Sequence, residues 1–298
     1  MEMRQLGRTD MIVGTLGFGG AEIGFEGVEP ETVNRMLNSA LDSGLNLIDT
    51  AECYENSEQL IGRAVAHRRS EFYLLTKCGH SDGWTRSNWS QTALLTSIRR
   101  SLTRLRTDYV DVIQLHSCSE EVLRKGAAIG ALLKAKENGY TRYCGYSGDG
   151  RAALYAINSG VFDVIQLSIN IADQEAVETL MPIAVSRHLG IIAKRSIANA
   201  IWKESARPPS SYDQPYWYRL NELSYPFIMK SLAFAVATAL QFTLSVPGVH
   251  SALVGTSKES RWQENRAMLD ANKMSAEEFA AIRSRWKEIS KGRWRSEI

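Results

Sequence analysis

The sequence predicts an α/β protein that folds as a single (β/α)8 TIM barrel, and three observations predict it. Eight short apolar segments are typical of strands, and each is followed by a segment with helical apolar spacing. The strand segments are apolar almost throughout, as strands are in parallel sheets that helices cover. The length of 298 residues suits one such barrel, which needs about 250 residues, so residues 1–298 are expected to form one domain.

The chain is expected to begin with a hairpin over Arg4–Val13 that turns near Gly7 to Asp10 and plugs one end of the barrel. The first strand and its loop follow at Thr15–Gly20. Pro30 fits the first position of the first helix, and Asn56 is the predicted N-cap of the second. The remaining strands are predicted at Leu45–Ile48, Phe72–Thr76, Tyr109–Leu115, Arg142–Tyr146, Asp163–Leu167, Gly190–Ala193 and Ala252–Val254.

The later helices follow the i, i+3, i+4 spacing of one-faced helices. They are predicted around Leu94–Leu105, Glu120–Asn138, Ala152–Ile157, Val177–Val185, Leu232–Leu240 and Glu259–Leu269. Trp202–Phe227 interrupts this rhythm and holds four of the seven prolines. A long loop on the C-terminal side of a barrel is typical of a lid or a binding loop.

The alternative is an open Rossmann sheet, whose fingerprint is GxGxxG at the opening of a helix. Gly17 and Gly19 supply the first two glycines, but Glu22 stands at the third. We also expect no helix to open there. The closed barrel is therefore favoured.

Composition excludes several classes of protein. The net charge of +2 comes without a dense block of Lys or Arg, so no nucleic-acid partner is expected. No apolar run approaches the roughly 20 residues of a membrane span, and Met1–Gln5 lacks the form of a signal peptide. The four cysteines form no CxxC pair, which indicates a reducing compartment. We expect a cytoplasmic protein with no membrane partner; the oligomeric state is not predicted.

Four polar side chains follow the ends of three consecutive predicted strands: Asp49 with Tyr54, then Lys77, then His116. Loops after the strands of a barrel share one rim, so these groups should converge. Together they suit carbonyl reduction, which needs a proton for the oxygen that receives negative charge. Tyr54 would donate it, Lys77 would lower the tyrosine pKa from about 10, Asp49 would orient Lys77, and His116 would hold the carbonyl oxygen. Each residue alone is more ordinary as a structural group, and the combination points to catalysis.

The chain resembles the aldo-keto reductase superfamily over nearly its whole length, from Leu6-Gly7 to Glu264-Asn265. The strongest piece is Gly44–Ala51 with Tyr54 and Ser57-Glu58. The catalytic tetrad of that family would fall on Asp49, Tyr54, Lys77 and His116. The resemblance implies a (β/α)8 barrel that uses NADPH without a metal, with Tyr54 as the proton donor.

The resemblance also implies cofactor contacts. It places the nicotinamide carboxamide on Ser147 and Gln166, and adenosine phosphate and adenine on Arg261 and Asn265. The other expected cofactor residues are Asp49, Lys194, Arg195, Ser196, Gly255, Thr256 and Ser257. Lys194 and Arg195 are expected to bind the pyrophosphate. Gly255, Thr256 and Ser257 are expected to open a helix, whose first backbone N–H groups suit phosphate. Two departures stand out. Gly148 replaces the usual asparagine, and Lys194-Arg195-Ser196-Ile197 replaces aromatic-Ser-Pro-Leu, so the aromatic platform for the nicotinamide is missing or different.

The sequence thus predicts NADPH-dependent reduction of a small-molecule aldehyde or ketone, whose identity is not predicted. One alternative is a non-enzymatic or regulatory barrel that binds NADPH, and another is an isomerase or lyase without nicotinamide. Trp84 and Trp89 are expected to wall the substrate pocket or to pack at the rim. Cys53, Cys78 and Cys118 flank the tetrad, and we hypothesise that Lys77 or a protonated His116 favours their thiolates. The alternative is that these thiols are inert packing.

Overall fold

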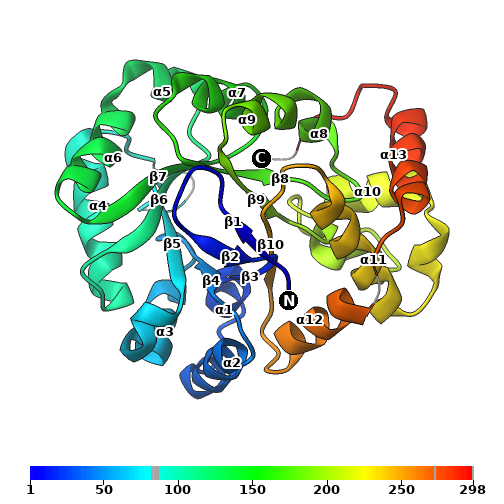
Figure 1. The fold of residues 1–298 in the computed structure, drawn as a ribbon, viewed down its shortest axis with the longest axis horizontal. Helices are drawn as coiled ribbons and strands as arrows, with labels where there is room; N and C mark the ends of the chain where they lie inside the picture. Colours follow the sequence, from blue (N-terminus) through cyan, green and yellow to red (C-terminus); the bar gives the residue numbers. More distant parts are fainter. Residues whose placement is uncertain (82, 84–86, 272, 297–298) are drawn as a thin grey trace.

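The computed structural model describes residues 1–81, 83, 87–271 and 273–296. Eight parallel strands close into a barrel in the order β10-β3-β4-β5-β6-β7-β8-β9, and helices surround them (Figure 1). The predicted (β/α)8 barrel is therefore confirmed. Its strands are β3 (Leu16–Gly19), β4 (Leu47–Asp49), β5 (Tyr73–Cys78), β6 (Val110–His116), β7 (Thr141–Ser147), β8 (Val164–Ser168), β9 (Gly190–Lys194) and β10 (Ser251–Gly255).

The helices follow the strands in the alternation that parallel pairing requires. The α-helices are α1 (Ala21–Phe25), α2 (Pro30–Asp42), α3 (Ser57–Val65), α4 (Gln91–Leu105), α5 (Glu120–Lys125), α6 (Ala127–Glu137), α7 (Gly150–Ser159), α8 (Glu175–Thr179), α9 (Met181–Ser186), α10 (Gln214–Leu223), α11 (Leu232–Ser245), α12 (Arg261–Ala271) and α13 (Ala276–Ser290). The 3-10 helices are η1 (Ala66–Glu71), η2 (Ala198–Lys203) and η3 (Pro226–Met229).

The predicted N-terminal plug is present as an antiparallel hairpin of β1 (Met3–Gln5) and β2 (Ile12–Gly14). It lies over the centre of the barrel in Figure 1. Leu6, Met11 and Val13 from the hairpin are fully buried in one apolar cluster with strand side chains. The strand members of this cluster are Leu47, Leu75, Val112, Val164, Ile192 and Leu253. The hairpin thus closes one end of the barrel, which leaves the opposite mouth for chemistry.

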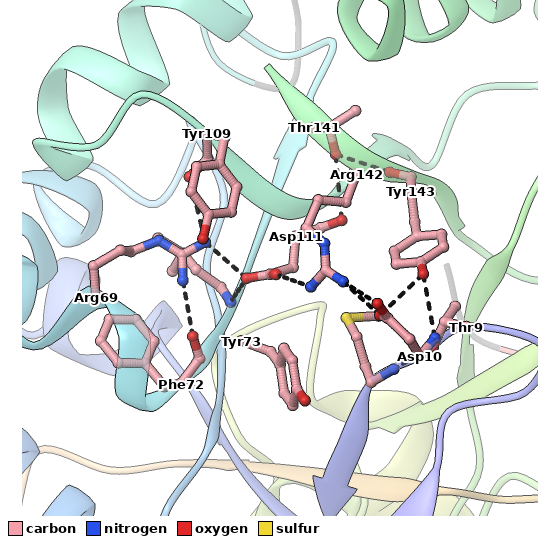
Figure 2. Close-up of polar contacts among 12 residues, drawn as sticks. Thr9, Asp10, Arg69, Phe72, Tyr73, Tyr109, Asp111, Thr141, Arg142 and Tyr143 are labelled. Carbon is pink, nitrogen blue, oxygen red and sulfur yellow. Dashed lines mark hydrogen bonds and ion pairs between the residues drawn. The ribbon is translucent and has the colours of Figure 1, made fainter. Parts of the chain in front are cut away.

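A charged network fastens the plug to the barrel wall (Figure 2). The buried carboxylate of Asp111 accepts hydrogen bonds from Arg69 at 2.7 Å and from Arg142 at 2.8 Å. It also accepts from the backbone N–H of Leu74 at 2.8 Å. Arg142 reaches on to both carboxylate oxygens of Asp10 in the hairpin, at 2.5 and 2.6 Å. A chain of opposite charges therefore links η1, β6 and β7 to the plug.

Two predicted helices are each divided in two. The helix predicted at Glu120–Asn138 breaks at Gly126, whose φ of +78° cannot continue an α-helix, so α5 ends there and α6 begins. The helix predicted around Val177–Val185 is divided between α8 and α9. Pro182 stands in the first turn of α9, where its missing N–H breaks no hydrogen bond.

Three local predictions are corrected. Helix α1 does begin after Gly20, where no helix was expected, although the third glycine of the Rossmann fingerprint is still absent. Asn56 precedes α3, but its side chain makes no capping hydrogen bond. The segment predicted as a long loop at Trp202–Phe227 contains α10, flanked by the short turns η2 and η3. Pro30 begins α2 as predicted.

Candidate active site

The four predicted catalytic residues come from consecutive strands at the open mouth of the barrel. Asp49 is the last residue of β4, and His116 is the last residue of β6. Lys77 lies inside β5 rather than after it, because the strand continues to Cys78. Tyr54 stands on the loop that leads to α3 and is half-buried. The structure thus brings the acid, phenol, amine and imidazole to one place.

Asp49 is held from two sides by buried donors. The ammonium of Lys77 donates to Oδ2 of Asp49 and, at 2.9 Å, to the carbonyl oxygen of Thr50. The amide Nε2 of Gln114 donates to Oδ1 of Asp49 at 2.8 Å. Gln114 is fully buried in β6 and pairs in register with Lys77 of β5. Sequence reasoning missed Gln114; the available signal was a polar residue in an otherwise apolar strand, two positions before His116.

The ring of Tyr54 packs against two of the other three residues, Lys77 and His116. The Lys77 Nζ lies 5.0 Å from the ring centroid, and the ring of His116 lies 5.8 Å from it in an edge-to-face arrangement. Burial first, and then the Asp49 carboxylate, raise the pKa of Tyr54 well above 10. The expectation that the Tyr54 pKa lies below 10 is wrong for the free protein, because desolvation and the Asp49 carboxylate both disfavour the phenolate. The phenol therefore keeps its proton in the free protein.

His116 is a neutral imidazole. Burial, followed by the nearby charges of Lys77 and His80, lowers its pKa well below 6.5. The Nε2 of His80 lies 2.7 Å from the backbone carbonyl oxygen of His116, so the two histidines are joined through the backbone. A neutral imidazole offers one N–H donor and one acceptor nitrogen. A protonated His116 is therefore not available to stabilise thiolates.

The flanking cysteines are thiols. Burial raises the pKa of Cys53 to about 12, even though Lys77 acts in the opposite direction. Burial likewise raises the pKa of Cys118 to about 12 and that of Cys78 well above 9. The thiolate hypothesis is wrong, because desolvation raises the pKa of all three thiols and, at Cys53, exceeds the attraction of Lys77. These sulfurs are protonated at neutral pH.

Ser147 and Gln166 are register neighbours at the ends of β7 and β8. The Ser147 hydroxyl donates to Oε1 of Gln166 at 2.9 Å. The Nε2 of Gln166 is buried and has no hydrogen-bond partner among the described residues. Gly148 also has a physical reason here, since a Cβ at this position would lie 2.5 Å from the hydroxyl of Tyr146. An asparagine would clash at this point.

The residues after β9 are engaged with the protein to different degrees. Lys194 forms a 2.8 Å ion pair with Asp149, and burial lowers the pKa of Lys194. Asp149 is buried and also accepts from the backbone and hydroxyl of Ser168; sequence reasoning missed it. The Ser196 hydroxyl lies 3.0 Å from two backbone carbonyl oxygens, those of Ala193 and Leu253, and is fully buried. The Ser196 hydroxyl therefore hydrogen-bonds to the backbone in this structure.

Arg195 connects the mouth to the aromatic segment after β9. Its Nε donates to the hydroxyl of Tyr212 at 2.7 Å, and its guanidinium lies 4.5 Å from the centroid of the Tyr212 ring. A guanidinium plane stacked on a phenol is a common cation–π arrangement. Lys194, paired with Asp149, thus stands at the position of the missing aromatic residue, and Arg195 follows it with its guanidinium against the ring of Tyr212.

Gly255, Thr256 and Ser257 precede α12 and do not open it, because the helix begins only at Arg261. The predicted helix start on these three residues is wrong. The carboxyl group of Glu22 lies against Gly255, where a Cβ would be 1.5 Å from Oε2 of Glu22. Burial raises the pKa of Glu22. Sequence reasoning considered Glu22 only as a missing glycine.

Arg261 and Asn265 lie one turn apart on α12. Arg261 forms a 3.0 Å ion pair with Glu264, in the next turn of the same helix. Asn265 is buried, and its Oδ1 has no hydrogen-bond partner among the described residues. Buried polar atoms without partners are uncommon and indicate a ligand or water. Gln166 and Asn265 thus fit the amide and the base of a nicotinamide dinucleotide.

The remaining predictions concern the two tryptophans expected at the rim of the barrel, metal binding and membrane spans. Trp84 lies outside the described residues. Trp89 is half-buried, and its ring packs 5.4 Å from His80. Within the described ranges, no three His, Cys, Asp or Glu side chains gather as metal ligands would. In the same part of the chain, no helix combines the length and apolar character that crossing a membrane requires.

A parallel eight-stranded barrel with this set of acid, phenol, amine and imidazole at its mouth defines a class of oxidoreductases that act on carbonyl compounds. The chain belongs to the Aldo/keto reductase family, whose sequence profile matches residues 10–287. It is 27% identical to the uncharacterized oxidoreductase YqkF of Bacillus subtilis, with 97% of each chain covered. It is also 27% identical to L-galactose dehydrogenase of Arabidopsis thaliana, with 100% of this chain and 98% of the relative covered.

Solved structures agree with this assignment. The holo form of the aldo-keto reductase AKR11C1 from Bacillus halodurans superposes with a TM-score of 0.81. The two chains are 26% identical, and 96% of each is covered. The similarity therefore extends over nearly the whole length of both chains.

Proposed function

We propose that this protein reduces an aldehyde or ketone to an alcohol with NADPH, and that Tyr54 is the general acid. The observation that carries the proposal is that Lys77 and His116 both lie against the ring of Tyr54, with Lys77 fixed by Asp49. A carbonyl oxygen placed against the phenol would meet a proton donor, a nearby ammonium and an imidazole. These are the groups that stabilise negative charge as it develops on oxygen.

The residues divide the work as follows. Tyr54 donates the proton, and the Lys77 ammonium stabilises the phenolate that remains. Asp49, itself held by Gln114, keeps Lys77 charged and in place. Neutral His116 donates a hydrogen bond that positions the carbonyl oxygen. Burial of Lys77 and Asp49 strengthens these interactions, because the effective dielectric constant is lower than in water.

NADPH, when bound, supplies the hydride. Ser147 and Gln166 would hold the carboxamide, since Nε2 of Gln166 lacks a partner among the described residues. Asn265 would contact the adenine and Arg261 the 2′-phosphate. Gly255, Thr256 and Ser257 would line the phosphate groups, and Arg195 and Lys194 would supply positive charge, although the ion pair with Asp149 compensates part of the charge of Lys194.

The test is turnover of a panel of aldehydes, ketones and sugars with NADPH and NADH, followed by the loss of the reduced nicotinamide. Sugars belong in the panel, together with the oxidative direction, because one relative is an L-galactose dehydrogenase. NADPH-dependent turnover that is lost in Lys77→Met supports the proposal. Tight NADPH binding with no turnover of any carbonyl would instead indicate a regulatory barrel.

A further inference from the structure

The thiol of Cys53 contacts the imidazole of His116, at a position that the proposed mechanism does not use. Its Sγ lies 3.4 Å from Nδ1 of His116. Cys53 directly precedes Tyr54 on the loop after β4, and its side chain is half-buried. Loop and strand therefore place a sulfur against the ring nitrogen on one side of His116.

The chemistry of the two groups decides the direction of this hydrogen bond. Burial keeps Cys53 protonated, since its pKa is raised to about 12. His116 is neutral, because burial and the charges of Lys77, His80, Lys194 and Arg195 lower its pKa. A thiol sulfur is a weak acceptor, whereas an imidazole nitrogen without hydrogen is a good one. The favourable arrangement has the S–H of Cys53 donating to Nδ1.

We propose that Cys53 is a positioning residue whose thiol sets the tautomer of His116, leaving the ring hydrogen on Nε2. The inference rests on the proposed function, in which His116 donates to the carbonyl oxygen. A neutral ring with its hydrogen on Nδ1 would present Nε2 as an acceptor, and an acceptor repels a carbonyl oxygen. The hydrogen bond from Cys53 disfavours that tautomer. Cys53 thus acts through His116 and does not touch the substrate.

The tautomer can be read directly by ¹⁵N NMR of the free protein with labelled histidine. The signals of His116 are assigned by their loss in His116→Gln. We expect wild-type His116 to be neutral with hydrogen on Nε2. In Cys53→Ala we expect a mixture of tautomers and a kcat lowered by about 2- to 10-fold, the effect of one hydrogen bond. KM should change less than kcat.

Two variants sharpen the test. Cys53→Ser keeps a donor in place and should restore both the NMR signature and kcat. Cys144→Ala removes another buried thiol, in β7, and should leave the His116 signals unchanged. The inference is overturned if wild-type His116 carries its hydrogen on Nδ1, or if Cys53→Ala keeps the wild-type signature. If no carbonyl is turned over, the proposed function fails, while the NMR result still decides the tautomer.

Discussion

Gln114 Nε2 donates a 2.8 Å hydrogen bond to Oδ1 of Asp49, the carboxylate whose other oxygen accepts from Lys77. All three side chains are buried inside the barrel. The two donors therefore fix both oxygens of one carboxylate, which in turn fixes the ammonium beside Tyr54. Gln114 is thus one of the two donors that fix the Asp49 carboxylate.

Replacing Gln114 with Met removes this donor while keeping the side-chain volume similar. We expect kcat to fall by about 10- to 100-fold, the effect of a lost hydrogen bond to a charged group. The measurement is steady-state kinetics on the best carbonyl of the panel, with thermal unfolding as the control for folding. A folded Gln114→Met variant with wild-type kcat would show that Lys77 alone holds Asp49.

Arg261 is expected to select NADPH, because NADH has no 2′-phosphate for its guanidinium to bind. Arg261→Ala should weaken the binding of NADPH by about 1–3 kcal/mol and leave the binding of NADH unchanged, as measured by fluorescence titration. Glu264→Gln is the matched control, since it removes the ion-pair partner of Arg261 and keeps the guanidinium. NADPH affinity in Glu264→Gln should hold or rise. If Arg261→Ala binds both cofactors with the wild-type affinities, Arg261 is a surface residue with no role in cofactor binding.

The network in Figure 2 makes a prediction about stability at the end of the barrel opposite the site. Asp111→Asn removes the buried charge that two arginines share, and it should lower the free energy of unfolding by about 2–4 kcal/mol. Asp10→Asn removes the charge at the exposed end of the same network and should lower the free energy of unfolding by about 1 kcal/mol or less. Urea unfolding measures both. Equal losses in the two variants would contradict the view that burial decides the effect.

His116 should make the stability depend on pH. Its pKa in the folded protein is well below the ordinary value of 6.5, so the unfolded chain binds the proton more readily. The stability that the neutral imidazole contributes is present above about pH 6.5 and is lost as the pH falls below it. The drop in Tm between about pH 7 and pH 5.5 should therefore be smaller in His116→Gln than in the wild type. His67→Gln, at an exposed position, is the control and should keep the wild-type slope.

Much of the fold was predictable because each barrel strand is a short apolar segment in the sequence. Apolar runs predicted every barrel strand, and a polar residue at or near a strand end marked Asp49, Lys77 and His116. The helix breaks were less visible. Gly126 and Pro182 divide helices that apolar spacing alone predicts as continuous. Strand ends were off by one or two residues, which put Lys77 after β5 rather than inside it.

The partners of the site residues could not be predicted, because strand register decides them. Gln114 meets Asp49 through the pairing of β4 with β5 and of β5 with β6. Lys194 meets Asp149 beside Ser168, at the end of the intervening strand β8. Electrostatics was the other failure. The sequence suggested that Lys77 would lower the pKa of Tyr54 and of the nearby thiols, but burial dominates once the loops close over them.

The central claim is that Tyr54 is the proton donor, and Tyr54→Phe tests it most directly. The variant keeps the ring that packs against Lys77 and His116 and removes only the hydroxyl. The account predicts that kcat falls by about 100- to 10,000-fold, the range for a lost general acid, while the affinity for NADPH is nearly unchanged. Wild-type turnover of an aldehyde by Tyr54→Phe would contradict the account.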